Sequence, residues 1–90
     1  MALFFVTALQ TYSPNVDAAI QSKIPATDSY QIETGKWIVD APVATSKDLS
    51  DFLDLTKATG HFVVPVRGYF GRSRPDFWEW LAAKTSKPNV

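Results

Sequence analysis

The sequence predicts a single α+β domain over residues 1–90. It is expected to form a split βαββαβ unit whose four-stranded antiparallel sheet has the spatial order 4-1-3-2, followed by a C-terminal helix. The first apolar run is apolar on both alternating faces, which is the pattern of a central strand. The last strand-like run contains a proline, which cannot donate to a neighbouring strand and is therefore confined to an edge or a bulge. These two observations, with the order of the patterns along the chain, place the first strand inside the sheet and the fourth at its edge.

The first strand is predicted over Leu3–Leu9, and a short amphipathic helix follows it. Ser13 is a favourable helix cap, and Pro14 is favoured in a first helical turn. The apolar side chains of this helix recur every four positions, at Val16, Ile20 and Ile24.

Two strand-like runs, SYQIE and KWIVDA, are separated by Thr34-Gly35 and predict a β-hairpin. A second helix is predicted after Thr45, because Thr45 and Asp48 resemble a capping box. Its apolar face is expected to hold the i, i+3, i+4 set Leu49, Phe52 and Leu53.

The run HFVVPVRGYF predicts the fourth strand, and Pro65 within it predicts an edge position. A third helix is predicted from Pro75, which suits a first turn, with Asp76 and Glu79 near the positive end of the helix. Its wide apolar arc consists of Phe77, Trp78, Trp80 and Leu81.

The composition excludes several classes of function. Nine Lys and Arg residues balance nine Asp and Glu residues, so no global field steers the chain towards nucleic acid or a membrane. The absence of cysteine excludes disulfides and thiolate chemistry, and it fits a reducing cytoplasm. No run approaches the ~20 apolar residues of a membrane span, and the start, MALFFVTALQTY, lacks the basic residues of a signal peptide. We therefore expect a cytoplasmic protein with no membrane segment and no cofactor.

The stretch GYFGRSRPDFWEW, residues 68–80, admits two interpretations. In the favoured one, the glycines turn the chain after the edge strand, and the following helix covers the sheet face that two helices leave open. The packing or interface residues would then be Trp37, Phe77, Trp78 and Trp80. In the other, a basic patch contacts phosphates while aromatic rings stack on bases. The nucleic-acid or partner contacts would then be Arg67, Arg72, Arg74, Lys36, Tyr69 and Phe70.

Residues with catalytic or metal-binding chemistry are few. His61 is the only histidine, and its place at a strand start favours a surface or capping role. Asp48, Asp51 and Asp54 recur every three residues, which is typical of a solvated helix face. No serine stands in a nucleophile context such as Gly-x-Ser-x-Gly, so the sequence predicts no catalytic residue and no metal ligand.

The order of elements, with GKWIV at the third strand and GYFGRSRPDFWEWL after the fourth, resembles a known group over nearly the whole chain. It is similar to the small ferredoxin-like proteins grouped with the SinR-annotated, VapD and CRISPR-adaptation endonuclease relatives. The resemblance implies a ferredoxin-like fold and a dimer formed through the sheets. Nucleolytic members of that group hold a metal with an aspartate at the end of the first strand. Here that stretch reads VTALQTYSP, with no acidic residue between Met1 and Asp17, so the resemblance does not extend to catalysis.

These observations predict a small non-enzymatic protein that acts by protein–protein contact, as a homodimer. Size and resemblance suggest an origin in a phage or mobile element, where such a domain binds and modulates a host protein. The alternative is a nucleic-acid-binding protein or a degenerate metal-dependent nuclease of the same fold.

Overall fold

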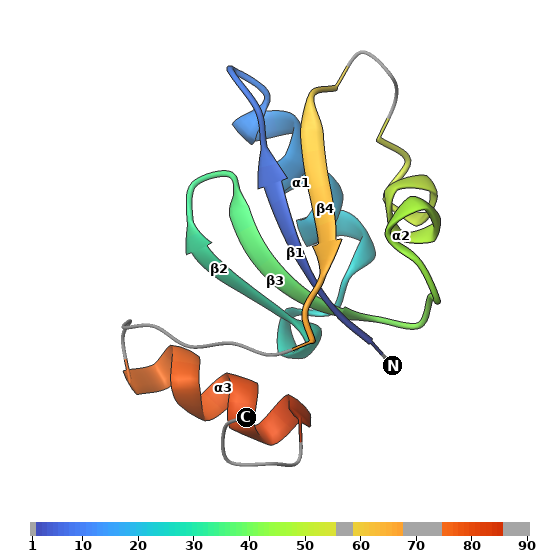
Figure 1. The fold of residues 1–90 in the computed structure, drawn as a ribbon. Helices are drawn as coiled ribbons and strands as arrows, with labels where there is room; N and C mark the ends of the chain where they lie inside the picture. Colours follow the sequence, from blue (N-terminus) through green and yellow to red (C-terminus); the bar gives the residue numbers. More distant parts are fainter. Residues whose placement is uncertain (1, 56–58, 68–74, 86–90) are drawn as a thin grey trace.

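The computed structural model describes residues 2–55, 59–67 and 75–85. Within these ranges the chain forms four strands, three α-helices and one short 3-10 helix, η1 (Figure 1). Their order is β1 (Ala2–Ala8), α1 (Ser13–Lys23), η1 (Ala26–Asp28), β2 (Ser29–Glu33), β3 (Lys36–Ala41), α2 (Ser46–Phe52), β4 (His61–Pro65) and α3 (Pro75–Thr85). The predicted α+β class is confirmed.

The strands form one antiparallel sheet in the order β2-β3-β1-β4. Counted from β4, this order is 4-1-3-2. β1 lies between β3 and β4, and β4 lies at an edge. The positions predicted from the apolar first run and from Pro65 are therefore the observed ones.

Hydrogen bonds beside β4 explain why a proline is tolerated there. The N–H of Val66 donates to the carbonyl of Leu3 at 2.9 Å, and the N–H of Leu9 donates to the carbonyl of Gly60 at 2.9 Å. Because alternate residues of an antiparallel strand direct their backbone groups to the same side, even-numbered residues here bond to β1. The nitrogen of Pro65 therefore faces the outer edge of the sheet. Its missing N–H costs no hydrogen bond there, because no strand of the described part of the chain lies on that side of β4.

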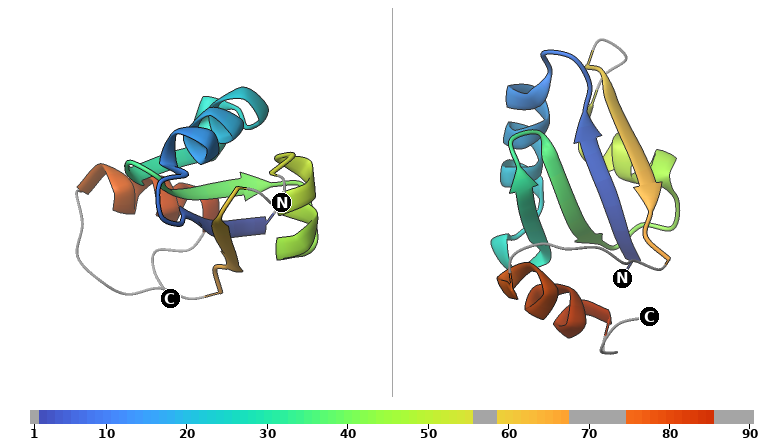
Figure 2. Two further views of the ribbon diagram at one scale, coloured as in Figure 1. Left: turned by 90° about the horizontal axis from the view of Figure 1, so that it is seen from above. Right: turned by 60° about the vertical axis from the view of Figure 1, so that its left-hand side comes forward.

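Helices α1 and α2 lie on one side of the sheet (Figure 2). The largest core cluster lies beneath them, and each of its fully enclosed members is at most 5% exposed. It includes Phe4, Val6, Trp37 and Val39 from the sheet, Val16 and Ile20 from α1, and Leu49 and Leu53 from the α2 region. Side chains alternate along a strand, so the neighbouring positions of β1 and β3 point to the opposite face.

The start of α1 differs from the prediction. Ser13 does not cap this helix: it is the first helical residue, and Tyr12 occupies the cap position without a side-chain capping bond. The Ser13 side chain instead lies so close to Gly35 that a Cβ at Gly35 would collide with it. Close packing against the hairpin turn therefore sets the position of this hydroxyl.

Helix α2 begins as predicted and ends earlier. The Thr45 side chain accepts a hydrogen bond from the N–H of Asp48 at 3.1 Å, which confirms the predicted cap. Phe52, expected on the apolar face, is 39% exposed. The helix ends at Phe52, and Leu53 follows it as the C-cap residue. The buried apolar contacts of this region come from Leu49 and Leu53.

Asp17 of α1 joins this helix to the β2-β3 hairpin. Its carboxylate accepts hydrogen bonds from the indole N–H of Trp37 at 2.7 Å and from the backbone N–H of Gly35 at 3.0 Å. The side-chain amide of Gln31 lies 3.4 Å from the other carboxylate oxygen. Gly35 has a φ of 79°, which glycine adopts without strain. The hairpin turn and the buried tryptophan therefore share one charged acceptor.

Candidate interaction surface

The candidate surface is the sheet face opposite α1 and α2. Register places Phe5 of β1 opposite Val64 of β4, and Thr7 opposite Phe62. Paired residues in an antiparallel ladder point to the same face, so these four side chains share the face that α1 and α2 leave open. Helix α3 is the one helix of the described ranges that packs against this face.

Helix α3 covers the part of the face formed by β2 and β3. Phe77 and Leu81 are 8% and 2% exposed and form a second core cluster with Ile38. The Tyr30 ring centroid lies 4.9 Å from that of Phe77 and 6.0 Å from that of Trp80. Such tilted aromatic contacts are favourable beyond the apolar area that they bury. The helix is therefore held at its β2 side by an aromatic cluster.

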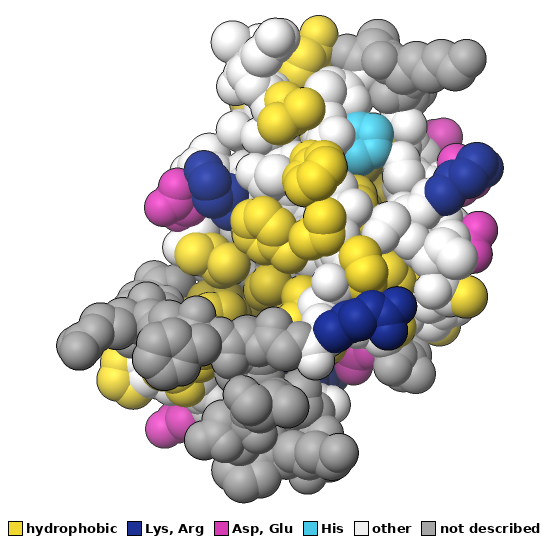
Figure 3. All heavy atoms as spheres, viewed as in Figure 1, with side chains coloured by type: hydrophobic (Ala, Val, Ile, Leu, Met, Phe, Trp, Pro, Cys, Tyr) yellow, Lys and Arg dark blue, Asp and Glu magenta, His cyan; other side chains and the backbone are white. Residues whose placement is uncertain are grey.

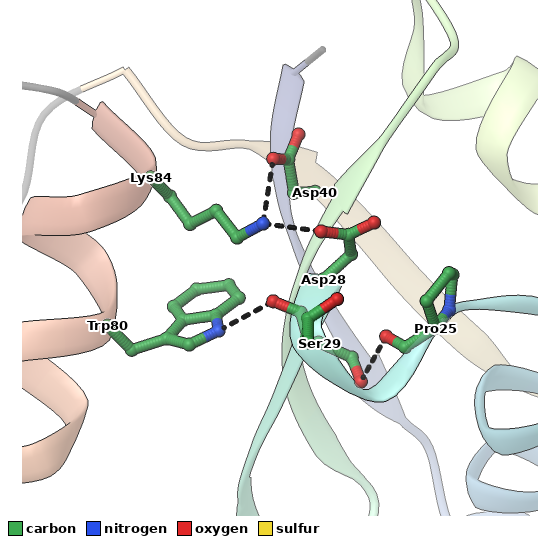
Figure 4. A network of polar contacts seen from close by, with 7 residues as sticks. Pro25, Asp28, Ser29, Asp40, Trp80 and Lys84 are labelled. Atoms are coloured by element: carbon green, nitrogen blue, oxygen red, sulfur yellow. Dashed lines mark hydrogen bonds and ion pairs between the residues drawn. The ribbon is translucent and has the colours of Figure 1, made fainter.

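Polar contacts hold the same helix near η1 (Figure 4). The indole N–H of Trp80 donates to the carbonyl of Thr27 at 3.2 Å. The Lys84 ammonium group binds the Asp28 carboxylate and lies 3.5 Å from a carboxylate oxygen of Asp40. Asp40 lies in β3 and is 9% exposed, so the Lys84 ammonium group compensates the charge of a buried carboxylate.

Replacing Lys84 with Met is expected to lower the free energy of unfolding by about 1–3 kcal/mol at neutral pH, because Asp40 would lose its nearby cation. The hydrogen bond to Asp28 raises the pKa of Lys84 above its ordinary value of 10.5, and desolvation by burial opposes the shift. A raised folded-state pKa means that this stabilisation is complete below pH 10.5 and is lost as the pH rises through the folded-state pKa. Urea unfolding at neutral and alkaline pH measures both effects.

The matched control is Lys47→Met, which removes an exposed ion pair with Asp51 on α2. This variant is expected to unfold like the wild type, since solvent screens such pairs. Equal unfolding midpoints for the Lys84 and Lys47 variants would contradict a stabilising role for Lys84.

Apolar side chains continue from the α3 cluster onto the β1-β4 part of the face, where Leu3 and Phe5 pack against that cluster. We define the open strip as Leu3, Phe5, Phe62 and Val64. Phe62 is 55% exposed, and the other three are half-buried. Figure 3 shows apolar side chains gathered on this side of the molecule. Exposed phenylalanine beside further apolar residues is typical of a contact surface.

Two of the predicted nucleic-acid contacts, Lys36 and Arg67, lie in the described ranges, and the fold does not bring them together. Lys36 is paired with Thr7 in the β-ladder and forms an ion pair with Glu33 at 2.9 Å. Arg67 follows Val66, whose N–H bonds to Leu3. Leu3 and Thr7 are separated by about 13 Å along β1, so Lys36 and Arg67 lie at opposite ends of that strand. The other four predicted contacts, Tyr69, Phe70, Arg72 and Arg74, lie outside the described residues.

The predicted packing residues divide between the two faces. Trp37 is 5% exposed and lies in the core beneath α1 and α2, away from the open strip. Phe77, Trp78 and Trp80 belong to α3 and pack on the other face, with the ring centroids of Phe77 and Trp78 5.2 Å apart. Trp37 and the α3 aromatic residues therefore belong to separate clusters.

The acidic residues of the α2 region do not form a metal site. Asp51 is in the ion pair with Lys47, and Asp54 lies beyond the end of the helix with a φ of 57°. In residues 2–55, 59–67 and 75–85, no group of three or more His, Cys, Asp or Glu side chains is arranged to hold a metal ion. No helix in these ranges is long and apolar enough to cross a bilayer.

Sequence reasoning missed Asp17, Asp28, Asp40 and Lys84, which make the main polar contacts of the fold. Comparison of the sequence with protein-family models and with curated proteins finds no match.

Proposed function

We propose that this chain is a small non-enzymatic binding protein of the ferredoxin-like fold, which pairs with a second copy of itself through the open strip and modulates a host protein. The 4-1-3-2 order of the sheet supports the fold assignment. The resemblance in layout to the SinR-annotated, VapD and CRISPR-adaptation endonuclease relatives, with the small size of the chain, is the basis for proposing an origin in a phage or mobile element. The absence of cysteine favours the reducing cytoplasm as its location.

The exposed phenylalanine at position 62 is the observation that carries this proposal. Fully burying a phenylalanine side chain contributes about 1.5–3 kcal/mol, and Phe62 is 55% exposed, so covering it would contribute about half of that amount. The adjacent Phe5 and Val64 extend the apolar area across two strands. A partner that covers this area would recover that free energy.

A second copy is the partner that fits the charge of this surface. The open strip consists of four apolar side chains, so two strips can meet without desolvating an unpaired charge. The ion pairs of Lys36 with Glu33 and of Lys84 with Asp28 are already satisfied within one chain. A two-fold dimer buries the same patch on both subunits, which a self-complementary apolar surface allows.

Phe62→Glu is expected to convert a dimer into a monomer with little loss of folding stability. Phe62 is 55% exposed within one chain, so the substitution is expected to affect association of two chains more than the folding of one chain. The matched control is Phe52→Glu, which changes an exposed phenylalanine of α2 on the other side of the sheet. Sedimentation equilibrium should give twice the 10.0 kDa chain mass for the wild type and the control, and 10.0 kDa for Phe62→Glu.

Thermal melting of all three proteins should accompany the sedimentation experiment. Similar melting temperatures would show that the difference lies in association. Wild-type and Phe62→Glu proteins of equal mass would overturn the proposal that the open strip pairs two copies.

A further inference from the structure

A serine and the only histidine of the sequence form a close pair between α2 and β4. Ser50 Oγ lies 2.7 Å from His61 Nε2, and the other ring nitrogen, Nδ1, lies 2.7 Å from the carbonyl oxygen of Thr59. Both side chains are half-buried, and the imidazole of this histidine is visible at the surface beside apolar side chains (Figure 3). The sequence predicted only a surface or capping role for His61.

The hydrogen-bond partners determine which ring nitrogen carries the proton. A carbonyl oxygen can only accept, so Nδ1 is protonated and donates to Thr59. In the neutral imidazole the lone pair of Nε2 then accepts from the Ser50 hydroxyl. This is the order of groups found in activated serine nucleophiles: a hydroxyl, a base within hydrogen-bond distance, and a third group that orients the base.

We propose that Ser50 is a nucleophilic serine that accepts the acyl group of an activated carboxylic ester, with His61 as its general base. The hydroxyl proton moves to Nε2 as Ser50 Oγ bonds to the carbonyl carbon of the ester. The bond from that carbon to the leaving oxygen breaks, and the leaving alcohol takes the proton from Nε2. The products are an acyl ester of Ser50 and a free alcohol.

The third group limits the reaction to a single acyl transfer. Thr59 supplies a neutral carbonyl, which orients the ring but stabilises an imidazolium cation less than a carboxylate does. Ser50 is therefore an acylation site and not the nucleophile of a rapid hydrolase. The pair lies between α2 and β4, so this inference is independent of the pairing of two open strips.

The test uses p-nitrophenyl acetate as the acyl donor, with mass spectrometry of peptides to locate each acetyl group. The wild type is expected to gain one acetyl group on Ser50, and Ser50→Ala is expected to lose it. His61→Gln keeps a hydrogen-bonding side chain but has no base, so acetylation of Ser50 is expected to slow by about 100-fold. The matched control, Ser22→Ala, removes an exposed serine whose hydroxyl donates to the Ala19 carbonyl, and it should react like the wild type.

Melting curves of the variants show whether each one is folded, and the wild-type peptide map tests the proposal even if a variant fails to fold. Acetyl groups on lysines or on His61 with none on Ser50 would overturn the proposal. Equal rates of Ser50 acetylation in the wild type and a folded His61→Gln variant would overturn it as well.

Discussion

Truncation of the chain before Pro75 is expected to lower the free energy of unfolding by about 3–5 kcal/mol or more and to leave the protein unfolded or aggregated. The truncation removes Phe77 and Leu81, which are 8% and 2% exposed, and uncovers Ile38 of β3. It also removes Lys84 from beside the buried Asp40. Total stabilities of small domains are only about 5–15 kcal/mol, so this loss is a large fraction.

Circular dichroism during heating and urea unfolding measure the effect of this truncation. The matched control ends the chain after Thr85 and keeps all of α3. A truncated protein that melts cooperatively at the control temperature would mean that α3 adds no stability. The Leu81→Ala variant provides a finer test, with an expected loss of about 2–5 kcal/mol, whereas Glu79→Ala on the exposed side of α3 should change little.

Asp17→Ala is expected to lower the free energy of unfolding by about 3 kcal/mol. The substitution leaves the indole N–H of Trp37 and the N–H of Gly35 without their shared acceptor. Trp37 is 5% exposed, so water does not readily replace the lost carboxylate. Each buried donor that is left unsatisfied costs about 1–3 kcal/mol, so the loss of the acceptor shared by two donors is expected to cost about 3 kcal/mol in total.

Two further variants separate the charge of Asp17 from its role as an acceptor. Asp17→Asn keeps one carbonyl oxygen and should lose less stability than Asp17→Ala. Trp37→Phe removes the indole donor, so the additional effect of Asp17→Ala in that background should be smaller. Urea unfolding of the wild type, Asp17→Ala, Trp37→Phe and the double variant gives the coupling free energy. A coupling of zero would contradict the contact between Asp17 and Trp37.

Local sequence patterns predicted most of the fold because strand position, edge position and helix capping each depend on residues that are close in the sequence. The run from Leu3 to Leu9 is apolar on both faces, and β1 has strands on both sides. Pro65 cannot donate, and β4 lies at an edge. Thr45 precedes Asp48 by three residues, and its side chain caps α2. In each case the signal and the structural feature lie within a few residues of one another.

The contacts that were missed join residues far apart in the chain. Lys84 and Asp28 are 56 positions apart, and Asp17 and Trp37 are 20 positions apart. Ser50 and His61 come together only because α2 packs beside β4. No spacing rule relates such positions, since their distance depends on how the elements pack. The wrong prediction for Ser13 has a related cause, because a long-range contact with Gly35 determines where that side chain lies.

The sequence predicted that one sheet face would be left open by the first two helices, but it did not predict which residues form the open strip. An uncovered sheet face and an aromatic third helix were expected from the number of helices and from their apolar arcs. The sequence predicts Trp37 as a packing or interface residue together with the α3 aromatic residues, but alternation along β3 places it on the other face. No local pattern predicts that Phe62 is exposed, because its exposure depends on how far α3 extends across the sheet.

The most direct test of the open strip as a dimer interface is the reactivity of a single thiol placed on it. The sequence contains no cysteine, so Thr7→Cys introduces one thiol beside Phe62, and Ser22→Cys introduces one on the exposed side of α1. If two strips pair, alkylation of the position-7 thiol by iodoacetamide should slow as the protein concentration rises from about 1 to about 100 μM, because association is concentration-dependent. Alkylation of the position-22 thiol should stay constant over the same range. A position-7 thiol that reacts at one rate at every concentration would contradict the interface.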